Sequence, residues 1–265
     1  MSSKTFTPLA LLIATTLLGT AGSAVAGDKL TIVSWGGAFT KSQVEAYHKP
    51  YIEKTGVELV SEDFSGGLAE IKAQVEADNV RWDLVSLDKP DIVRGCAEGL
   101  LEPVDPSILP AGADGTPAQE DFIPGAIHEC AVNTIVVSTV LTINEDAFKG
   151  KSAPTKLVDL FDLQKYPGRR ALQKMPQGNL EWALIADGVK PENVYQMLET
   201  REGRHRAFAK LDSIKPYVVW WTTGAQPPQM LADKEVIMAS AFNGRIHSAT
   251  EEEGQPFKIL SLIHI

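Results

Sequence analysis

The chain has 265 residues, of which 44% are hydrophobic, 22% charged and 7% aromatic. This composition is too apolar for a disordered chain, and the length allows one large domain or two modest ones. The 25 Lys and Arg residues against 34 Asp and Glu residues give a formal net charge of −9. The chain therefore lacks the basic excess that binds phosphate backbones, and we expect no nucleic acid partner and no binding to anionic membrane surfaces.

Residues 1–26 have the pattern of a secretory signal peptide. Lys4 is their only charged residue, an apolar run covers 9–18, and small residues end at Ala24-Val25-Ala26. A membrane anchor is the alternative reading. The unbroken apolar core, however, is nearer to about ten residues than to the roughly twenty that cross a bilayer. We expect cleavage after Ala26 and export of the chain.

Cys96 and Cys130 are the only two cysteines. Oxidising compartments favour pairing of an even number of cysteines, so we predict one disulfide between them in the exported chain. Two buried free thiols remain the alternative, because only the geometry of the fold decides whether the two side chains can meet.

Strands and helices alternate along the first half of the chain. The pattern predicts strands at 29–34, 57–61 and 82–87, with helices at about 38–55, after 65–67 and from 89 onward. Such alternation implies a parallel sheet covered by helices, with ligand sites beyond the carboxyl ends of the strands. The exits of the three strands are Trp35-Gly36-Gly37, Ser65-Gly66-Gly67 and Asp88.

A second α/β unit is expected after a Pro-, Gly- and Asp-rich connection at 102–125. Residues 131–143 form a β-rich run longer than an ordinary strand, and we interpret it as one strand that crosses between two lobes. Further strands are predicted at 170–173, 217–221 and 236–241, with helices at about 155–161, 179–187, 191–200, 204–213 and 228–233. The expected organisation is a first lobe at 27–138 and a second lobe at 139–247.

Signatures of catalysis and of metal binding are absent from the sequence. There is no phosphate-binding G-x-x-x-x-G-K-[ST] loop, no H-E-x-x-H and no G-x-S-x-G nucleophile elbow. The five histidines are dispersed without the spacing of metal ligands. We therefore predict a binding protein without a cofactor or metal, and not an enzyme.

Short stretches in a consistent order resemble the periplasmic solute-binding proteins of ABC importers, in the branch that contains the spermidine/putrescine receptors. The matching stretches are VSWGGA at 33–38, WDLVSLD at 82–88, EGLLEPV at 98–104, WTTGAQ at 221–226 and FNGR at 242–245. The resemblance implies a two-lobed receptor of the Venus-flytrap type, which closes on a small solute and presents it to a membrane permease. It also implies a monomer in the periplasm.

The resemblance carries an expectation about the ligand. Polyamine receptors of this family hold their cationic ligands with carboxylates and aromatic rings, and Trp35 matches one such ring. The acidic residue expected two places later is replaced by Gly37, and Arg245 replaces another acid, while Asp88 stands where a serine is usual. An arginine would repel a diammonium ligand in a dry cleft. The solute is therefore expected to be a zwitterion such as 4-aminobutyrate, with a polyamine as the other candidate.

In this interpretation Arg245 forms a bidentate fork with the ligand carboxylate, while Asp88 and the aromatic rings take its ammonium group. Arg245 could instead begin a helix or form an ion pair between the lobes. Ser65 could cap the following helix, and Gln226 could lie in a rigid turn. The full set of expected ligand-binding residues is Trp35, Gly36, Gly37, Ser65, Asp88, Trp221, Gln226, Phe242, Asn243 and Arg245.

Two further expectations follow from the same resemblance. Receptors of this branch are usually longer, and their chain returns from the second lobe to complete the first. Residues 248–265 are therefore expected to begin this return toward the first lobe, and the chain is interpreted as truncated at its C-terminal side. A periplasmic enzyme or a chemosensory binding module acting on a similar solute is the alternative function. An enzyme would need a nucleophile and base in contact, and the sequence offers no such pair.

Overall fold

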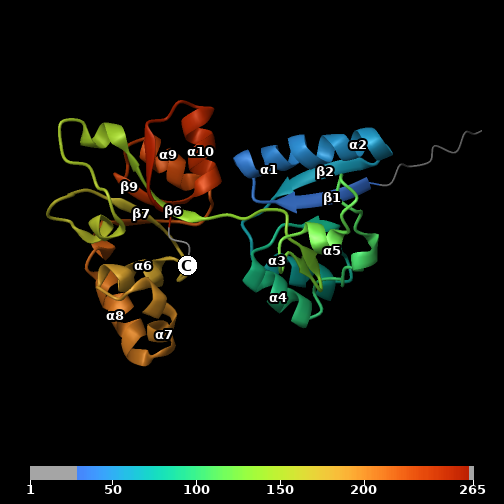
Figure 1. The fold of residues 1–265 in the computed structure, drawn as a ribbon, viewed down its shortest axis with the longest axis horizontal. Coiled ribbons are helices and arrows are strands. Elements are labelled where there is room, and N and C mark those ends of the chain that lie inside the picture. The colour runs from blue at the N-terminus through green and yellow to red at the C-terminus, as the bar shows by residue number, and fades with distance from the viewer. Residues whose placement is uncertain (1–28, 263–265) are drawn as a thin grey trace, which may run out of the picture.

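The computed structural model describes residues 29–262, and the expected signal segment at 1–26 lies outside these residues. Two lobes, each built on its own sheet, are joined by an extended linker (Figure 1). Within residues 29–262, every helix is too short or too polar to cross a lipid bilayer.

The first lobe contains a parallel sheet in the order β2-β1-β3. Its strands are β1 (Lys29–Ser34), β2 (Glu58–Asp63) and β3 (Leu84–Val85). The strand predicted at 82–87 is thus shorter than expected, while the other two agree with the sequence pattern. The alternation of strands and helices produces this sheet because each strand returns parallel to the previous one after a covering helix.

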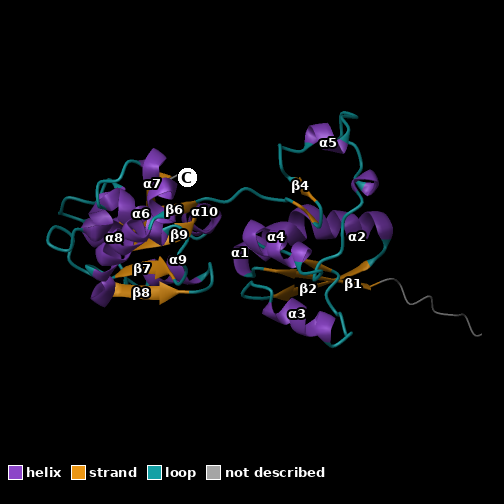
Figure 2. Cartoon of the chain, turned by 90° about the horizontal axis from the view of Figure 1, so that it is seen from below, coloured by secondary structure: helices purple, strands orange, loops and turns teal. Residues whose placement is uncertain are grey.

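Four helices accompany this sheet, α1 (Gly37–Gln43), α2 (Lys49–Thr55), α3 (Ala69–Glu76) and α4 (Lys89–Ala97). A π-helical turn at Val44–His48 joins α1 to α2, so the helix predicted at 38–55 is continuous. It ends where Gly56 takes a left-handed conformation with φ of 74°. Helices α1 and α2 cover one face of the sheet, and α3 covers the other (Figures 1 and 2).

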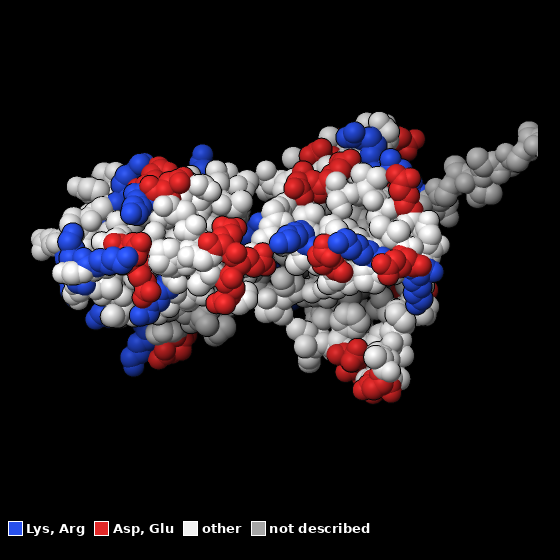
Figure 3. All heavy atoms as spheres, turned by 90° about the horizontal axis from the view of Figure 1, so that it is seen from above, with Lys and Arg blue, Asp and Glu red and all other residues white. Residues whose placement is uncertain are grey.

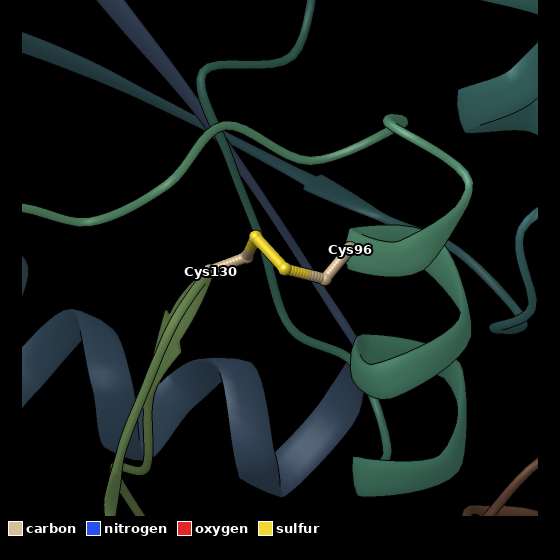
Figure 4. Close-up of a disulfide and its surroundings, with 2 residues drawn as sticks. All are labelled: Cys96 and Cys130. Atoms are coloured by element: carbon tan, nitrogen blue, oxygen red, sulfur yellow. A yellow bond between two sulfur atoms is a disulfide. The ribbon is translucent and has the colours of Figure 1, made fainter.

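The connection after α4 is tied back to the lobe by a disulfide. It contains a 3₁₀ turn at Pro106–Ile108, the short helix α5 (Ala118–Asp121) and a hairpin of β4 (Ile127–His128) and β5 (Ala131–Val132). Cys130 in the hairpin turn is bonded to Cys96 near the end of α4, with their Cα atoms 5.8 Å apart (Figure 4). The structure thus contains the disulfide predicted from the sequence.

The long run at 131–143 is not one strand, so that prediction was wrong. Residues 131–132 form β5 in the first lobe, and β6 (Thr139–Asn144) begins the second sheet. The residues between them lie in an extended linker, where Ile135, Val136 and Val137 are at least half exposed. Branched side chains favour a strand only where a neighbouring strand pairs with it, and the linker has no such neighbour between the lobes.

The second lobe is built on a five-stranded mixed sheet in the order β10-β6-β9-β7-β8. Strands β7 (Arg170–Gln173), β8 (Val218–Trp221) and β9 (Met238–Phe242) are parallel, and β6 is antiparallel to β9. The α-helices of this lobe are α6 (Asn179–Ala186), α7 (Val194–Glu199), α8 (Arg201–Asp212), α9 (Gln226–Ala232) and α10 (Asn243–Glu251). Its 3₁₀ helices are at Glu145–Phe148, Leu157–Phe161, Pro191–Asn193 and Lys215–Tyr217.

Strand β6 lies at the centre of the core of this lobe, with Val140, Leu141, Thr142 and Ile143 fully buried. Successive side chains of a strand point to opposite faces. Val140 accordingly packs in one apolar cluster with Trp221, and Leu141 and Ile143 pack in another. Burial on both faces explains why apolar side chains occur on both faces of this strand rather than on alternate residues only.

The resemblance implies that residues 248–265 form a segment that returns toward the first lobe. In the structure α10 extends to Glu251, and Phe257–Leu262 form β10, an edge strand of the second sheet. Strand β6 leads away from the linker, and β10 is antiparallel to it. Strand β10 therefore runs back toward the linker, but it is still paired within the sheet of the second lobe.

Candidate functional site

The carboxyl edges of the two sheets face each other. Strand β1 runs toward the second lobe, and β2 and β3 are parallel to it (Figure 1). In the second lobe β9 runs opposite to β6 and therefore back toward the linker, together with β7 and β8. Loops after the carboxyl ends of parallel strands are where α/β sheets bind ligands. The topology therefore brings the strand exits of both lobes to one junction.

Arg245, in the first turn of α10, reaches across this junction. Its Nη2 donates a hydrogen bond to the backbone carbonyl of Trp35 over 3.0 Å, and its Nη1 lies so close to Gly37 that a Cβ there would collide with it. Only 9% of Arg245 is exposed. Its other N–H groups have no hydrogen-bond acceptor among residues 29–262, and none of these nitrogens is a fully buried atom without a partner. The side chain is thus mostly buried, while its unused donors lie at the accessible edge of the junction.

Burial lowers the pKa of Arg245, and the nearby charge of Asp63 acts in the opposite direction. A desolvated guanidinium that forms no ion pair within the described chain is a favourable place for an anion, because a carboxylate would restore both charge balance and hydrogen bonds. Arg245 does lie at the start of a helix, as the alternative interpretation allowed, but it is mostly buried, and its polar contact to the first lobe goes to a backbone carbonyl and not to an acidic side chain.

Aromatic rings line the first-lobe side. The rings of Trp35 and Phe64 have centroids 5.2 Å apart, and Phe64 meets Trp82 edge-to-face at 5.6 Å. Trp35 lies over Gly66, where a Cβ would collide with its ring. The glycine after β2 is therefore needed for the Trp35 ring to lie flat against the loop, a role visible only in the fold.

Asp88 lies at the same edge, as the residue before α4. Ser86, two residues earlier, donates its N–H to Val33, which extends the pairing of β1 and β3 toward Asp88. Partial burial of its carboxyl group, and then the negative charge of Asp91, raise the pKa of Asp88. Its side chain accepts no hydrogen bond from residues 29–262, so this carboxyl group is free to meet a cation.

On the second-lobe side the structure puts Phe242, and not Trp221, at the surface. Trp221 is fully buried, and its Nε1 donates a hydrogen bond to Ser240 Oγ over 3.2 Å. Phe242 is partly exposed and meets Trp221 edge-to-face at 5.5 Å. The opposite orientation of adjacent strand residues turns Trp220 outward, 40% exposed. Trp221 therefore lies in the core beneath Phe242 and packs against its ring.

Two other predicted ligand residues, Gln226 and Asn243, have structural contacts of their own, and a third, Ser65, has none among the described residues. Gln226 Oε1 accepts hydrogen bonds from the N–H groups of Thr222 and Thr223, which stabilises the turn before α9. Asn243 Oδ1 accepts the N–H of Ser138, and the N–H of Asn243 donates back to the Ser138 carbonyl. Asn243 therefore connects the linker to α10. Ser65 is exposed, and it does not cap α3, whose N-cap is Leu68.

A shallow depression, too tight to hold a water molecule, lies at the carboxyl edge of the second sheet. Its lining residues come from β6, β7, β9 and the start of α6, and are Thr139, Gln173, Gln177, Gly178, Asn179, Trp182 and Ser240. These were not predicted as ligand residues. The sequence could have indicated them, because several follow the carboxyl end of the strand at 170–173. Trp35 and Asp88 were selected because they follow the carboxyl ends of other strands.

An exposed ion pair also joins the lobes. Lys41 Nζ in α1 lies 3.2 Å from Glu252 Oε2, just after α10. Figure 3 looks onto the face that carries α1, α2 and α10, where acidic side chains of the second lobe lie beside basic ones of the first. The ion pair of Lys41 with Glu252 and the hydrogen bond of Arg245 to Trp35 thus both join the α10 region of the second lobe to the first part of the first lobe. In the described part of the chain, no group of three or more His, Cys, Asp or Glu side chains is placed to hold a metal ion.

The sequence matches a family model described as "Bacterial extracellular solute-binding protein" over residues 46–263. The chain belongs to this family. The resemblance inferred from the short stretches is thus confirmed for the family, whose members bind solutes. A relative from Pseudomonas aeruginosa, a gamma-aminobutyric acid-binding protein, is 44% identical over 239 residues, which are 89% of this chain and 65% of that protein. The chain thus spans less than two thirds of this curated relative.

Solved structures share the fold of this solute-binding protein. The binding protein MotA from Agrobacterium tumefaciens B6, in complex with glucopine, is 33% identical with a TM-score of 0.77, covering 87% of this chain and 68% of that one. The structure described as the Atu4243-GABA receptor is 31% identical with a TM-score of 0.70, covering 88% and 68%. The predicted two-lobed periplasmic binding protein fold is therefore confirmed.

Proposed function

We propose that this solute-binding protein is the receptor of an ABC importer, that it acts in the periplasm, and that it delivers a short zwitterionic ω-amino acid such as 4-aminobutyrate to a membrane permease. The single observation that carries the proposal is Arg245 at the junction of the lobes, a mostly buried side chain whose guanidinium leaves most of its N–H donors unused by residues 29–262 and accessible at the junction. A ligand carboxylate fits this position because a bidentate fork uses two of those donors.

The opposite end of the ligand is assigned to the first lobe. An ammonium group is attracted to the faces of Trp35 and Phe64 and to the carboxyl group of Asp88. The raised pKa of Asp88 means that too little positive charge lies nearby to stabilise its ionised carboxylate, so a bound cation would lower that pKa again. Phe242 supplies an apolar surface for the methylene groups between the two charged ends.

The relatives support the same solute class. One is named for gamma-aminobutyric acid and another is described as a GABA receptor. A solute with two ammonium groups would place a positive charge beside Arg245, which costs free energy in a site with little water. We therefore place polyamines below 4-aminobutyrate in affinity. We further propose that the protein releases its solute unchanged, as a receptor and not an enzyme, and acts as a monomer.

Titration calorimetry with 4-aminobutyrate, putrescine and spermidine tests this proposal. For the wild type we expect binding of 4-aminobutyrate at least about 100-fold tighter than putrescine, and a loss of at least about tenfold in Arg245→Ala. Arg94→Ala, an exposed arginine in α4, is the matched control and should bind like the wild type. Tight putrescine binding that survives the loss of Arg245 contradicts the proposal.

A further inference from the structure

Asp63, the last residue of β2, stands outside the ligand set predicted from the sequence, yet the fold brings it to the same junction. Its Oδ1 accepts a hydrogen bond from Thr40 Oγ1 over 2.9 Å, and Thr40 Oγ1 in turn accepts the N–H of Gly36 over 2.9 Å. Its Oδ2 lies against Gly36, since a Cβ on that glycine would be 2.8 Å away. The carboxylate is therefore held in place by the loop after β1.

The guanidinium of Arg245 lies against the next residue of the same loop. Its Nη1 occupies the space where Gly37 would carry a Cβ, just as Asp63 occupies that space at Gly36. Both glycines have positive φ values, 70° and 56°, a conformation that only glycine adopts readily. One two-glycine loop thus holds an acidic group from β2 and a basic group from α10 on neighbouring residues.

Asp63 and Arg245 do not neutralise each other. The two described side chains form no ion pair within 4.0 Å, although Asp63 is the charge that offsets the effect of burial on Arg245. The Asp63 carboxylate is exposed, and its hydrogen bond to Thr40 uses only Oδ1. It therefore keeps an unused oxygen and a negative field beside the proposed carboxylate-binding arginine.

We propose that Asp63 is a specificity-determining residue, which makes the site select solutes with one carboxylate and one ammonium group over dicarboxylates. This inference rests on the proposed function. With the ligand carboxylate on Arg245, an ammonium group is attracted to Asp63, whereas a second carboxylate would face it and be repelled. Specificity then arises from a repulsive element as well as an attractive one. A monocarboxylate without a second charge should respond to Asp63 less than a dicarboxylate does, because only its one carboxylate, held on Arg245, lies near this negative charge.

The test compares three solutes of similar length, 4-aminobutyrate, butyrate and glutarate, on the wild type and Asp63→Asn. We expect Asp63→Asn to lose about tenfold in affinity for 4-aminobutyrate and to gain about tenfold for glutarate. Butyrate binding should gain less than glutarate binding, because butyrate brings only one carboxylate near Asp63 and glutarate brings two. Glu58→Gln, at the opposite end of the same strand, is the matched control and should leave all three affinities unchanged.

A purely structural role for Asp63 gives a different result. If Asp63→Asn weakens all three solutes by the same factor, or leaves the ratio of 4-aminobutyrate to glutarate unchanged, the inference is overturned. Thr40→Val removes the hydrogen bond to Asp63 but keeps its charge, so this ratio should remain near the wild-type value. Asp63→Ser, checked for folding by circular dichroism, replaces Asp63→Asn if that variant does not fold.

The inference and the proposed function fail in distinguishable ways. Wild-type protein that binds none of the three solutes contradicts the proposed function, and the inference with it. Wild-type protein that binds 4-aminobutyrate, with a ratio unchanged by Asp63→Asn, contradicts only the role of Asp63.

Discussion

The guanidinium of Arg245 donates a hydrogen bond to the backbone carbonyl of Trp35, a residue 210 positions earlier in the chain. This contact joins the start of α10 in the second lobe to the loop after β1 in the first. It uses one of the five N–H donors of the side chain. The arginine is therefore already positioned at the junction, and a ligand carboxylate needs to displace at most this one contact.

Gly37→Ala should disrupt the position of Arg245. The new Cβ would occupy the place of Arg245 Nη1, and alanine at φ of 56° is itself strained. We expect the affinity for 4-aminobutyrate to fall by at least about tenfold, because a displaced guanidinium no longer meets the carboxylate. Titration calorimetry measures this loss.

Gly56→Ala is the control for this change. Gly56 has φ of 74°, but a Cβ at this position would meet no atom within 4 Å, so the substitution carries the backbone strain without the collision. It should cost about 1 kcal/mol of stability and leave ligand affinity unchanged. Equal affinities of the two variants would mean that the space at Gly37 does not matter.

Arg170→Ala should strongly destabilise the second lobe. Arg170 is the first residue of β7, at the end of the strand opposite the carboxyl edge where the proposed site lies. Arg170 is fully buried, and its guanidinium donates to the backbone carbonyls of Leu160, Asp162, Tyr166 and Gly168. Removing it leaves these acceptors without their donor and opens a cavity. We expect a loss of more than about 3 kcal/mol in the free energy of unfolding, measured by denaturant titration.

The adjacent arginine provides the comparison. Arg169 is exposed and its guanidinium pairs with Glu235 at 3.0 Å on the surface. Arg169→Ala should therefore cost less than about 1 kcal/mol. A similar cost for both substitutions would show that the buried hydrogen bonds of Arg170 contribute little.

Removing the disulfide should destabilise the first lobe. Cys96 and Cys130 are 34 positions apart, and a loop of this length corresponds to about 3–4 kcal/mol in the chain-entropy description. We expect Cys96→Ser with Cys130→Ser to unfold at lower denaturant concentration than the wild type. Reductant should lower the wild-type midpoint to that of the double variant and leave the variant unchanged. A wild-type midpoint insensitive to reductant would contradict a stabilising bond.

The stability of the first lobe should depend on pH through His48. His48 is buried between the π-helical turn and β2, where its Nδ1 lies 3.2 Å from Ser61 Oγ, and burial lowers its pKa from the ordinary 6.5. The unfolded chain then binds the proton more readily than the folded one. This contribution to stability is present above pH 6.5 and is lost as the pH falls toward the lowered pKa.

Thermal unfolding between pH 7.5 and 5.5 checks this sign. The melting temperature of the wild type should fall over this range, and it should fall less in His48→Gln, which has no titrating ring. His247→Gln changes an exposed histidine and should follow the wild type. A wild type and His48→Gln with parallel curves would exclude His48 as the cause.

Local patterns in the sequence were sufficient for most elements. The strands at 29–34 and 170–173 agree with β1 and β7, and the helix at 38–55 agrees with α1 and α2. Periodicity and glycine stops are local, so they survive without knowledge of the fold. The run at 131–143 failed for the opposite reason, since whether branched residues form a strand depends on a partner strand elsewhere in the chain.

The candidate site was predictable only in part. The strand exits indicated Trp35, Gly37 and Asp88, because carboxyl ends of parallel strands meet at one edge. The same reasoning could not show that Trp221 points into the core while Trp220 points outward. Which face of an edge strand is buried depends on the helices that pack against it.

The sequence by itself determined the class of most elements, the two-lobed family of solute-binding proteins and the presence of an arginine where relatives of the polyamine type carry an acid. Only the tertiary structure decided that Asp63 and Arg245 lie on neighbouring glycines of one loop. The physical reason is distance along the chain. Hydrogen-bond ladders and apolar periodicity are set by nearby residues, whereas a contact between β2 and α10 exists only after both sheets have formed and the lobes have met.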